Sequence, residues 1–397
     1  MPIDERELEK DSRLERSVTE GRRPERLEQL DSLRGLAAFS VVMCHYLLVY
    51  PLVWRWYSGL PAGKIMRYLS FPPLYPLWDG HAAVVLFFIL SGFVLALPVL
   101  QNRQPVYRHY LLKRVLRIYV PYAAAMVAAI PGAFFLSRGH IPELSQWFQY
   151  SWTTPVTLKI IKHHAILIRS FDTSPYNNPI WSLVHEMRIS IVFPLLALWV
   201  ARQRWFISVA GVLVLFVGGW IISQKTTGFS NAEAWDSIGT TVHYASLFIL
   251  GAILAKYRRM FSARIEVMPR WGVVSLTIVF LLLYSWDRYT PHARMGTLLH
   301  LYELPSAVGA GALIILAASS SWLLAPGLIW LGRISYSLYL WHLPVMLAIV
   351  HVGFGHAPVG LLLAVSVLSS LIVATLMHSL VEVPAISLGR RLCAKDW

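Results

Sequence analysis

An apolar segment of membrane length, residues 33–53, carries the two residues whose types and spacing first point to chemistry. Arg34 stands at its start and His45 in its middle. About 20 apolar residues rising 1.5 Å each cross the hydrocarbon core of a bilayer. The two positions are eleven residues apart, about three helical turns, so both side chains share one helix face, about 16 Å apart. Ionisable groups inside a membrane helix are costly, which makes this surface cation and this deep base functional candidates.

A second candidate is Glu186, which follows the Asn178-Pro179 pair by about two turns. Proline suits the first turn of a helix, here one that enters from the outer side. Glu186 then lies about 10 Å deep and His45 about 12 Å deep, so the two reach a similar level. A carboxylate there can orient and polarise the imidazole of a general base. Two alternatives stay open: hydrogen bonding between helices without chemistry, and neutralisation of Glu186 by Arg188.

Arg114 and Arg117 form a basic pair three residues apart at the predicted cytoplasmic start of a span. This spacing puts them on one helix face. Guanidinium groups bind phosphate in a bidentate way, and a helix N-terminus adds backbone donors, so the pair can dock a phosphate-bearing donor. The alternative is anchoring to anionic lipid, which spacing alone favours. His342, near mid-membrane in its own segment, is either a structural hydrogen-bonding residue or a second catalytic histidine.

Positioning these residues requires an all-α, polytopic bundle of about ten transmembrane helices. Basic loop residues favour the cytoplasmic side, and ten spans with both termini cytoplasmic collect most of them there. A short basic segment near 155–170 is predicted to be a surface or re-entrant helix. If it were an eleventh span, the orientation of all later spans would reverse, and the basic residues 256–259 would lie on the outer side. The predicted spans are 33–53, 81–100, 118–136, 180–200, 205–223, 241–256, 270–286, 304–320, 334–354 and 357–380.

Composition agrees with a membrane protein. Apolar residues make up 56% of the chain and charged residues 14%, with a mean hydropathy of +0.54. The net charge of +14 is spread through short loops, which is typical of orientation signals and not of nucleic-acid binding. The two cysteines, Cys44 and Cys393, are too far apart for a disulfide or metal framework. We expect a flexible cytoplasmic tail at 1–30 without a signal peptide, one membrane domain at 31–391, and a cytoplasmic tail at 392–397.

In order along the chain, several segments resemble the integral-membrane acyltransferase family 3, and the likeness runs from about residue 31 to 391. Each segment is short, but the ordered set is specific. The segments are Asp31 to Ala38 followed by His45; Val84 to Phe93; Arg114-Val115-Leu116-Arg117; Trp181-Ser182-Leu183 with Glu186; Tyr336-Ser337 to His342; and Glu382-Val383-Pro384.

The resemblance implies a membrane-bound O-acyltransferase of a bacterial-type cytoplasmic (inner) membrane. Members transfer acyl groups, often acetyl from acetyl-CoA, to extracytoplasmic carbohydrates or small molecules. It implies acyl-CoA as donor substrate, no permanently bound cofactor and no metal. It also favours the donor-dock interpretation of the basic pair. The expected acceptor is a carbohydrate or a glycolipid. The implied residues are His45 and Glu186 for catalysis, Arg34, Arg114 and Arg117 for donor binding, and Asp31, Trp181, Ser182 and His342 as further candidates.

Other partners and functions remain open at this stage. Some family members carry an appended esterase-like domain; none follows here, so we expect the chain either to act alone or to need a separate extracytoplasmic transferase. His45 can serve as general base or as transient acyl carrier. A proton-coupled transporter or flippase would also use buried histidines and glutamates, although no internal repeat is evident. A membrane scaffold or sensor is the third interpretation.

Overall fold

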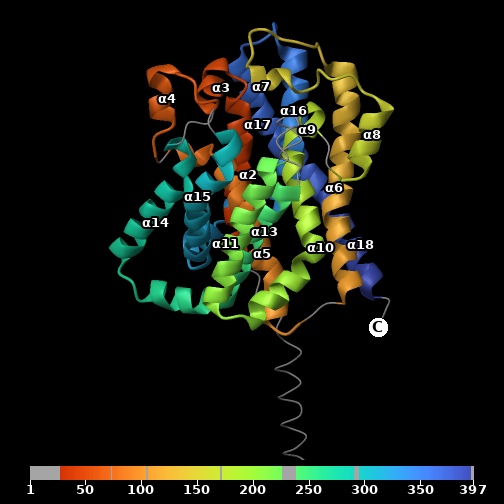
Figure 1. Cartoon of the computed structure of the whole chain (residues 1–397). Coiled ribbons are helices and arrows are strands. Elements are labelled where there is room, and N and C mark those ends of the chain that lie inside the picture. Colours follow the sequence, from red (N-terminus) through yellow and green to blue (C-terminus); the bar gives the residue numbers. More distant parts are fainter. Residues whose placement is uncertain are drawn as a thin grey trace, which may run out of the picture.

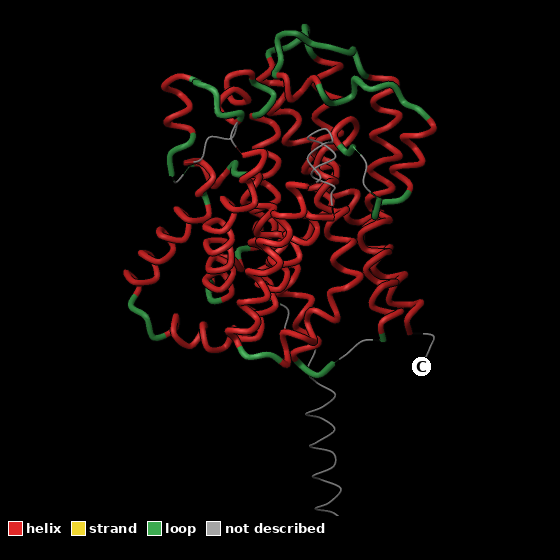
Figure 2. The backbone as a smooth tube through the Cα atoms, in the orientation of Figure 1, coloured by secondary structure: helices red, strands yellow, loops and turns green. Residues whose placement is uncertain are grey.

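The computed structural model describes residues 27–394 except 73, 104–105, 170–171, 226–237 and 290–294. Figure 2 shows that this part of the chain consists of helices and the loops between them. Long helices run up and down through the molecule; most of the short helices gather at its upper end in Figure 1, while the last helix of the chain lies at its lower end.

The long helices form the bundle. They are α2 (Glu28–Leu47), α5 (Gly80–Leu100), α6 (Tyr107–Leu136), α10 (Trp181–Arg202), α11 (Trp205–Lys225), α13 (Ile238–Glu266), α14 (Arg270–Tyr284), α15 (Met295–Ala318), α16 (Pro326–Gly353) and α17 (Val359–Met377). The shorter α-helices are α3 (Pro51–Tyr57), α4 (Gly63–Leu69), α7 (Gln146–Gln149), α8 (Leu158–Ala165), α9 (Ser174–Asn177) and α18 (Val383–Ala394). The remaining turns are the 3₁₀ segments η1 (Tyr75–Leu77), η2 (Asn178–Ile180), η3 (Trp286–Tyr289) and η5 (Ser321–Leu324), and the π-helical turn η6 (His378–Glu382).

The predicted all-α polytopic bundle is confirmed. Seven helices of the described residues are long and apolar enough to cross a membrane, or eight if α2 and α3 count as one broken span. Two shorter apolar helices, Arg270–Tyr284 and Glu303–Ala318, lie beside them. The count of ten spans and the cytoplasmic position of both termini stay predictions.

Two predicted boundaries differ from the structure in ways that matter for the site. The segment 33–53 is not one helix: α2 spans Glu28–Leu47, and α3 follows at a bend of 114°. Pro51 starts α3, because proline cannot continue a preceding helix but fits a first turn. The helix predicted from 118 begins at Tyr107, so Arg114 lies two turns inside α6 and away from the free backbone donors of its N-terminus.

The buried side chains form two apolar cores that share α2 as a wall. The first core joins α2, α6, α16 and the short upper helices, and it receives Ala38 and Val42 from α2. The second core joins α5, α10, α13 and α15, and it receives Ala37 and Val41 from α2. Successive residues of a helix point about 100° apart, so adjacent positions of α2 serve different cores.

Glycine contacts fix α2 against α16. A Cβ on Gly35 would lie 2.6 Å from the backbone nitrogen of Gly332, and a Cβ on Gly332 would lie 2.4 Å from the carbonyl oxygen of Asp31. Only residues without a side chain allow backbones this close, a common device between membrane helices. The two helices both run upward from this contact, so residues separated by 297 positions in the sequence face each other.

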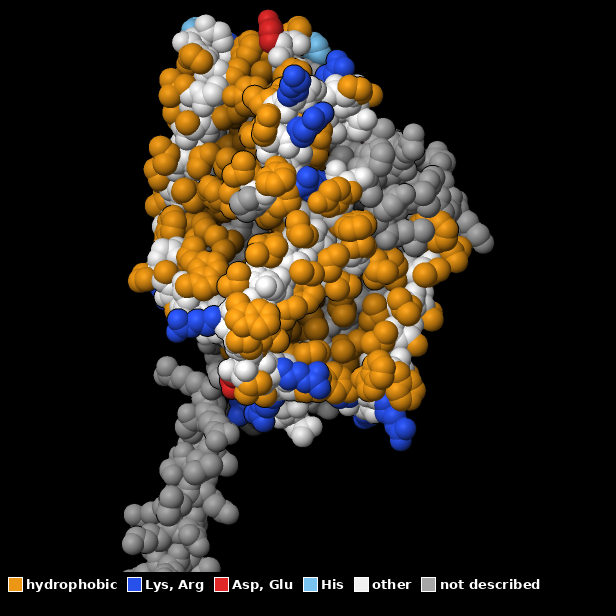
Figure 3. All heavy atoms as spheres, turned by 90° about the vertical axis from the view of Figure 1, so that its left-hand side faces the viewer, with side chains coloured by type: hydrophobic (Ala, Val, Ile, Leu, Met, Phe, Trp, Pro, Cys, Tyr) orange, Lys and Arg blue, Asp and Glu red, His pale blue; other side chains and the backbone are white. Residues whose placement is uncertain are grey.

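The outer surface suits a lipid environment. Figure 3 shows hydrophobic side chains covering most of one face, with lysine and arginine side chains grouped at its lower end and in its upper part. Large apolar side chains such as Val127, Phe134 and Leu195 are at least 70% exposed. Exposed apolar area of this extent is tolerated where lipid tails replace water.

Candidate active site

His45 on α2 contacts His342 on α16, the helix that packs directly against α2. The contact of Gly35 with Gly332 sets the register of the two helices, and that register brings the two histidines together. Their Nδ1 and Nε2 atoms lie 2.9 Å apart, and the two positions differ by the same 297 residues as Gly35 and Gly332. Trp147 of α7 stacks on the ring of His45, with ring centroids 5.4 Å apart. His342 is fully buried, whereas His45 keeps some exposure.

Hydrogen bonding assigns the protons of the neutral histidine pair. His342 Nδ1 lies 3.0 Å from the carbonyl oxygen of Leu338, which can only accept, so Nδ1 carries the proton. His342 Nε2 is then an acceptor and takes the Nδ1–H of His45. His45 Nε2 is left without a proton and with its lone pair available. A neutral imidazole in this state can take a proton from a hydroxyl group or attack a carbonyl carbon.

Tyr46 strengthens the same contact from the neighbouring position. Its hydroxyl donates to the carbonyl oxygen of His342 at 3.1 Å and lies 2.7 Å from Ser370 Oγ on α17. The side chain is buried, so this bridge holds three helices together beside the histidine pair. Because His342 is held through its backbone and through Nδ1, its ring has a fixed orientation toward His45.

Glu186 pairs with Arg114. Arg114 Nη2 donates to Glu186 Oε1 at 2.7 Å, and both Nε and Nη2 donate to Ser190 Oγ at 3.2 and 3.0 Å. Tyr110 donates to the carbonyl oxygen of Ser190 and braces this part of α10. Arg188, the other expected partner of Glu186, instead donates to Ile168 O and Thr241 Oγ1. The carboxylate expected beside His45 is thus bound by Arg114, and His342 occupies the place at His45 Nδ1.

The three arginines of the predicted donor dock, Arg34, Arg114 and Arg117, lie within electrostatic reach of one another; we call them the arginine cluster. Arg117 interacts with both other guanidinium groups and with Glu382 and Glu186. Arg34 Nε donates to Ser335 Oγ at 2.9 Å, and its Nη2 lies 3.8 Å from Asp31.

Arg117 differs from its two neighbours in the cluster. No hydrogen bond or ion pair of the described residues involves its guanidinium, whereas Arg34 and Arg114 have both. Glu382, which lies in the π-helical turn η6, accepts from Ser337 Oγ and lies 3.1 Å from His378 Nδ1. A π-helical turn often marks a functional position, and here it carries the carboxylate that faces Arg117. Arg117 is therefore the guanidinium with donors to spare for a ligand.

Trp181 and Ser182 hold the start of α10 in place. Ser182 Oγ lies 2.8 Å from the Tyr339 hydroxyl, which also donates to the carbonyl oxygen of Pro179. Trp181 packs against Phe88 and Tyr244 of the second core. The two side chains thus tie the start of α10 to α16 and to the second core, and they keep Glu186 at its level.

Sequence reasoning missed a second ionisable group, in the second core. His81 Nε2 lies 2.9 Å from Glu303 Oε1, and His243 Nε2 lies 2.5 Å from Glu303 Oε2. Tyr244 donates to Glu303 Oε1 at 3.4 Å, and Glu303 is 2% exposed. The predicted span began at 304, one residue after Glu303. A glutamate on an otherwise apolar helix was the signal that could have revealed the group.

Comparison with known proteins identifies relatives. A family model described as an acyltransferase domain matches residues 27–378. Nodulation protein 10 of Rhizobium leguminosarum bv. viciae is 25% identical over 387 residues, covering 92% of this chain and 95% of its own. Acyltransferase MdmB of Streptomyces mycarofaciens is 26% identical, covering 92% of this chain and 93% of its own.

A third relative is longer than this chain. Peptidoglycan O-acetyltransferase OatA of Listeria monocytogenes serovar 1/2a is 24% identical over 345 residues, covering 80% of this chain. The match spans 49% of that protein, about half its length. No solved structure matches the chain.

Proposed function

The chain belongs to the acyltransferase 3 family, and from this premise we propose that it moves an acyl group, acetyl in the first instance, from cytoplasmic acyl-CoA to a hydroxyl group of an extracytoplasmic carbohydrate. The relative named as a peptidoglycan O-acetyltransferase supports the carbohydrate acceptor. The proposed location is a bacterial-type cytoplasmic membrane.

The observation that carries the proposal is that one face of α2 bears both Arg34, a member of the arginine cluster, and the free imidazole lone pair of His45. Arg34 hydrogen-bonds Ser335 of α16, and His45, eleven residues further along α2, hydrogen-bonds His342 of the same helix. That is about 16 Å, a distance that an extended pantetheine arm covers. The phosphates of acyl-CoA bind Arg117, Arg34 and Arg114 by charge-assisted hydrogen bonds, and the thioester reaches His45.

The chemical step uses His45 Nε2. The imidazole takes the proton of the acceptor hydroxyl as the hydroxyl oxygen bonds to the thioester carbonyl carbon. The carbon–sulfur bond then breaks, and the proton passes to the thiolate. The imidazolium formed in between is stabilised by His342 Nε2, which accepts from His45 Nδ1 at 2.9 Å. In the carrier form of the same step, Nε2 itself bonds to the carbonyl carbon before the hydroxyl attacks.

A sided reconstitution tests the proposal. Full-length protein in liposomes receives acetyl-CoA on one face and a soluble oligosaccharide acceptor on the other, and free CoA and acetylated sugar are quantified. We expect both products in equal amounts, and only when acyl-CoA meets the face that bears the start of α2. Movement of substrate across the bilayer with no CoA release would support a transporter and overturn the enzyme proposal. Rapid acid quench distinguishes general base from carrier, because only the latter leaves an acetyl group on His45.

A further inference from the structure

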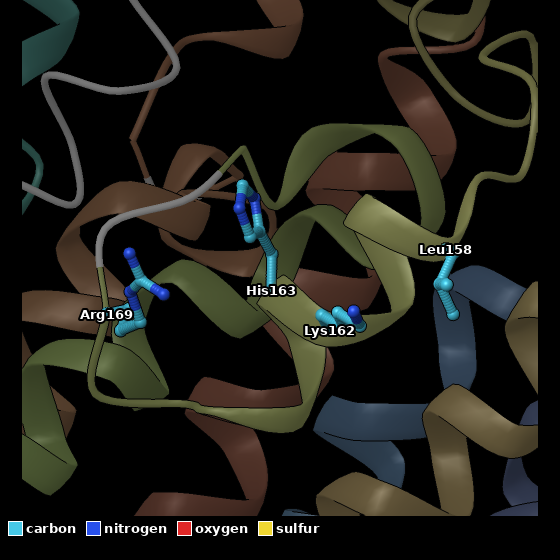
Figure 4. A pocket seen from close by; sticks show the side chains of 4 residues that line it. All are labelled: Leu158, Lys162, His163 and Arg169. Carbon is cyan, nitrogen blue, oxygen red and sulfur yellow. The ribbon is translucent and has the colours of Figure 1, made fainter.

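A cationic pocket lies beside α8, apart from the residues assigned above. It has a volume of about 330 Å³ and is lined by Leu158, Lys162, His163 and Arg169. Figure 4 shows Lys162 and His163 projecting from α8 and Arg169 from the loop that follows it. None of the residues proposed for acyl transfer lines this pocket, so it needs its own explanation.

The backbone beside the pocket is tied down by side-chain donors from two long helices. Tyr119 and Tyr122 of α6 donate to the carbonyl oxygens of Ala165 and His164, each at 2.7 Å. Arg188 of α10 donates to the carbonyl oxygen of Ile168 at 2.8 Å. Three bonds of this kind within five residues hold α8 and the following loop against the bundle. The backbone that carries the pocket cations is therefore fixed against the bundle, while the Lys162 and Arg169 side chains stay exposed.

These ties lie at mid-height of the bundle. Tyr119 and Tyr122 are 12 and 15 residues after Tyr107, the first residue of a 30-residue helix. Arg188 is 14 residues from either end of the span Ser174–Arg202. The segment near 155–170 therefore reaches the middle of these two long helices, which favours the re-entrant interpretation over the surface one. At that depth an unneutralised cation is costly.

The pocket cations have no carboxylate partner within the described residues. No ion pair there involves Lys162, His163 or Arg169. The nearest acid along the chain, Asp172, accepts from the backbone nitrogen of Ser174 and acts electrostatically on His164. A counter-charge for Lys162 and Arg169 must then come from outside the described chain.

The surroundings of the pocket indicate what the counter-ion is attached to. Ile161, Ile166 and Ile168 are between 44% and 47% exposed. Apolar side chains exposed at this depth face lipid tails. The charge of the pocket comes from a lysine and an arginine, the pair that binds phosphate through a point charge and a bidentate fork.

We propose that the pocket binds the phosphate group of a membrane amphiphile whose hydrocarbon chain lies along Ile161, Ile166 and Ile168. Two sources share this chemistry, an anionic phospholipid headgroup and a lipid-linked sugar phosphate. The site does not depend on acyl transfer. Its position on the side of α10 that carries Arg188, two residues from Glu186, would hold a lipid-linked molecule close to the helix that bears the proposed catalytic carboxylate.

Binding of four probes to the purified full chain tests the site without acyl-CoA. The probes are phosphatidylglycerol, an isoprenyl phosphate, the matching isoprenyl alcohol and inorganic phosphate, each titrated by native mass spectrometry. We expect at least one phosphorylated amphiphile to bind about tenfold or more tightly than the alcohol and the free phosphate. Preference for phosphatidylglycerol identifies a headgroup site, and preference for the isoprenyl phosphate identifies a lipid-linked ligand.

Two double variants make the test specific. Lys162→Gln/Arg169→Gln removes the pocket charge, and we expect the preference for the phosphorylated probe to fall to within about twofold of the alcohol. Lys64→Gln/Arg67→Gln removes two exposed cations from α4, a short helix at the upper end in Figure 1, and we expect it to leave the preference unchanged. Equal binding of phosphate and alcohol by the unmodified protein, or equal loss in both variants, would overturn the proposal. Acyl transfer is measured separately, so failure of one proposal leaves the other standing.

Discussion

The two buried histidine groups of this molecule are built in opposite ways. In the first core, His45 and His342 share one hydrogen bond, and the chain of donors ends on a carbonyl oxygen. In the second core, Glu303 lies between His81 and His243, with one carboxylate oxygen close to each ring. The first arrangement leaves a lone pair without a proton, and the second leaves both carboxylate oxygens engaged. Burial of an ionisable residue therefore does not by itself identify a candidate catalytic group. The better sign is a hydrogen-bonding atom of that residue that has no partner in the protein.

Loss of His45 should produce the largest effect on activity. We expect His45→Gln to lower acyl transfer by about 10²–10⁴-fold, the usual contribution of a general base, because the amide keeps the size of the side chain but cannot accept a proton. Turnover of labelled acyl-CoA by purified protein measures this. Transfer at the unmodified rate would remove His45 from the mechanism.

Glu303 should matter for stability instead. We expect Glu303→Gln to cost about 1–3 kcal/mol of unfolding free energy, because the amide has one acceptor oxygen where the carboxylate places one oxygen at each of two imidazole rings. Thermal unfolding in detergent reads out the loss. Turnover per folded molecule should stay close to that of the unmodified protein; a selective loss of turnover at unchanged stability would put the second core into the chemistry.

Variants of Arg117 and Arg114 should have different effects, because Arg117 is proposed to bind the donor and Arg114 holds the carboxylate of Glu186. We expect Arg117→Ala to raise the KM for acyl-CoA by about 10–100-fold, since it removes the guanidinium that is free to bind phosphate. Arg114→Ala should lower kcat as well, because it leaves Glu186 without its partner at 2.7 Å. Equal changes in KM and kcat for both variants would contradict the distinction.

His342 should have the smallest effect of the four. We expect His342→Asn to lower kcat by about tenfold with little change in KM, because it removes the acceptor that fixes the tautomer of His45 while His45 itself remains. The acid limb of the pH profile of kcat should shift as well. A variant with reduced folded yield but an unchanged pH profile would make His342 purely structural.

Much of the site could be predicted from residue types alone, but its pairing could not. Arg34, His45, Arg114, Arg117, Glu186 and His342 were all candidates because ionisable groups are rare in apolar helices. Nothing in one sequence shows that helices 297 residues apart lie in register, so the partner of His45 was expected on α10 when it lies on α16. Similar depth does not imply contact, since two helices at one level can face different neighbours.

The overall class was predictable for a related reason. Every backbone N–H and C=O group inside lipid needs a hydrogen-bond partner, and an α-helix supplies it within the same segment. Apolar segments of membrane length therefore imply helices. Helix ends were less predictable because polar first turns, such as residues 107–113 of α6, continue a helix beyond its apolar part. The same limit hid Glu303, which lies inside α15 but one residue before the predicted span 304–320.

The close approach of α2 and α16 at Gly35 and Gly332 has a mechanical consequence. Backbones in direct contact leave no room for a molecule to pass between them, and neither helix can slide without breaking the hydrogen bonds of Arg34 and Tyr46. The two helices therefore move as one rigid unit. Any opening that admits a donor or releases a product must form where this rigid pair of helices meets α6, α10 or α5.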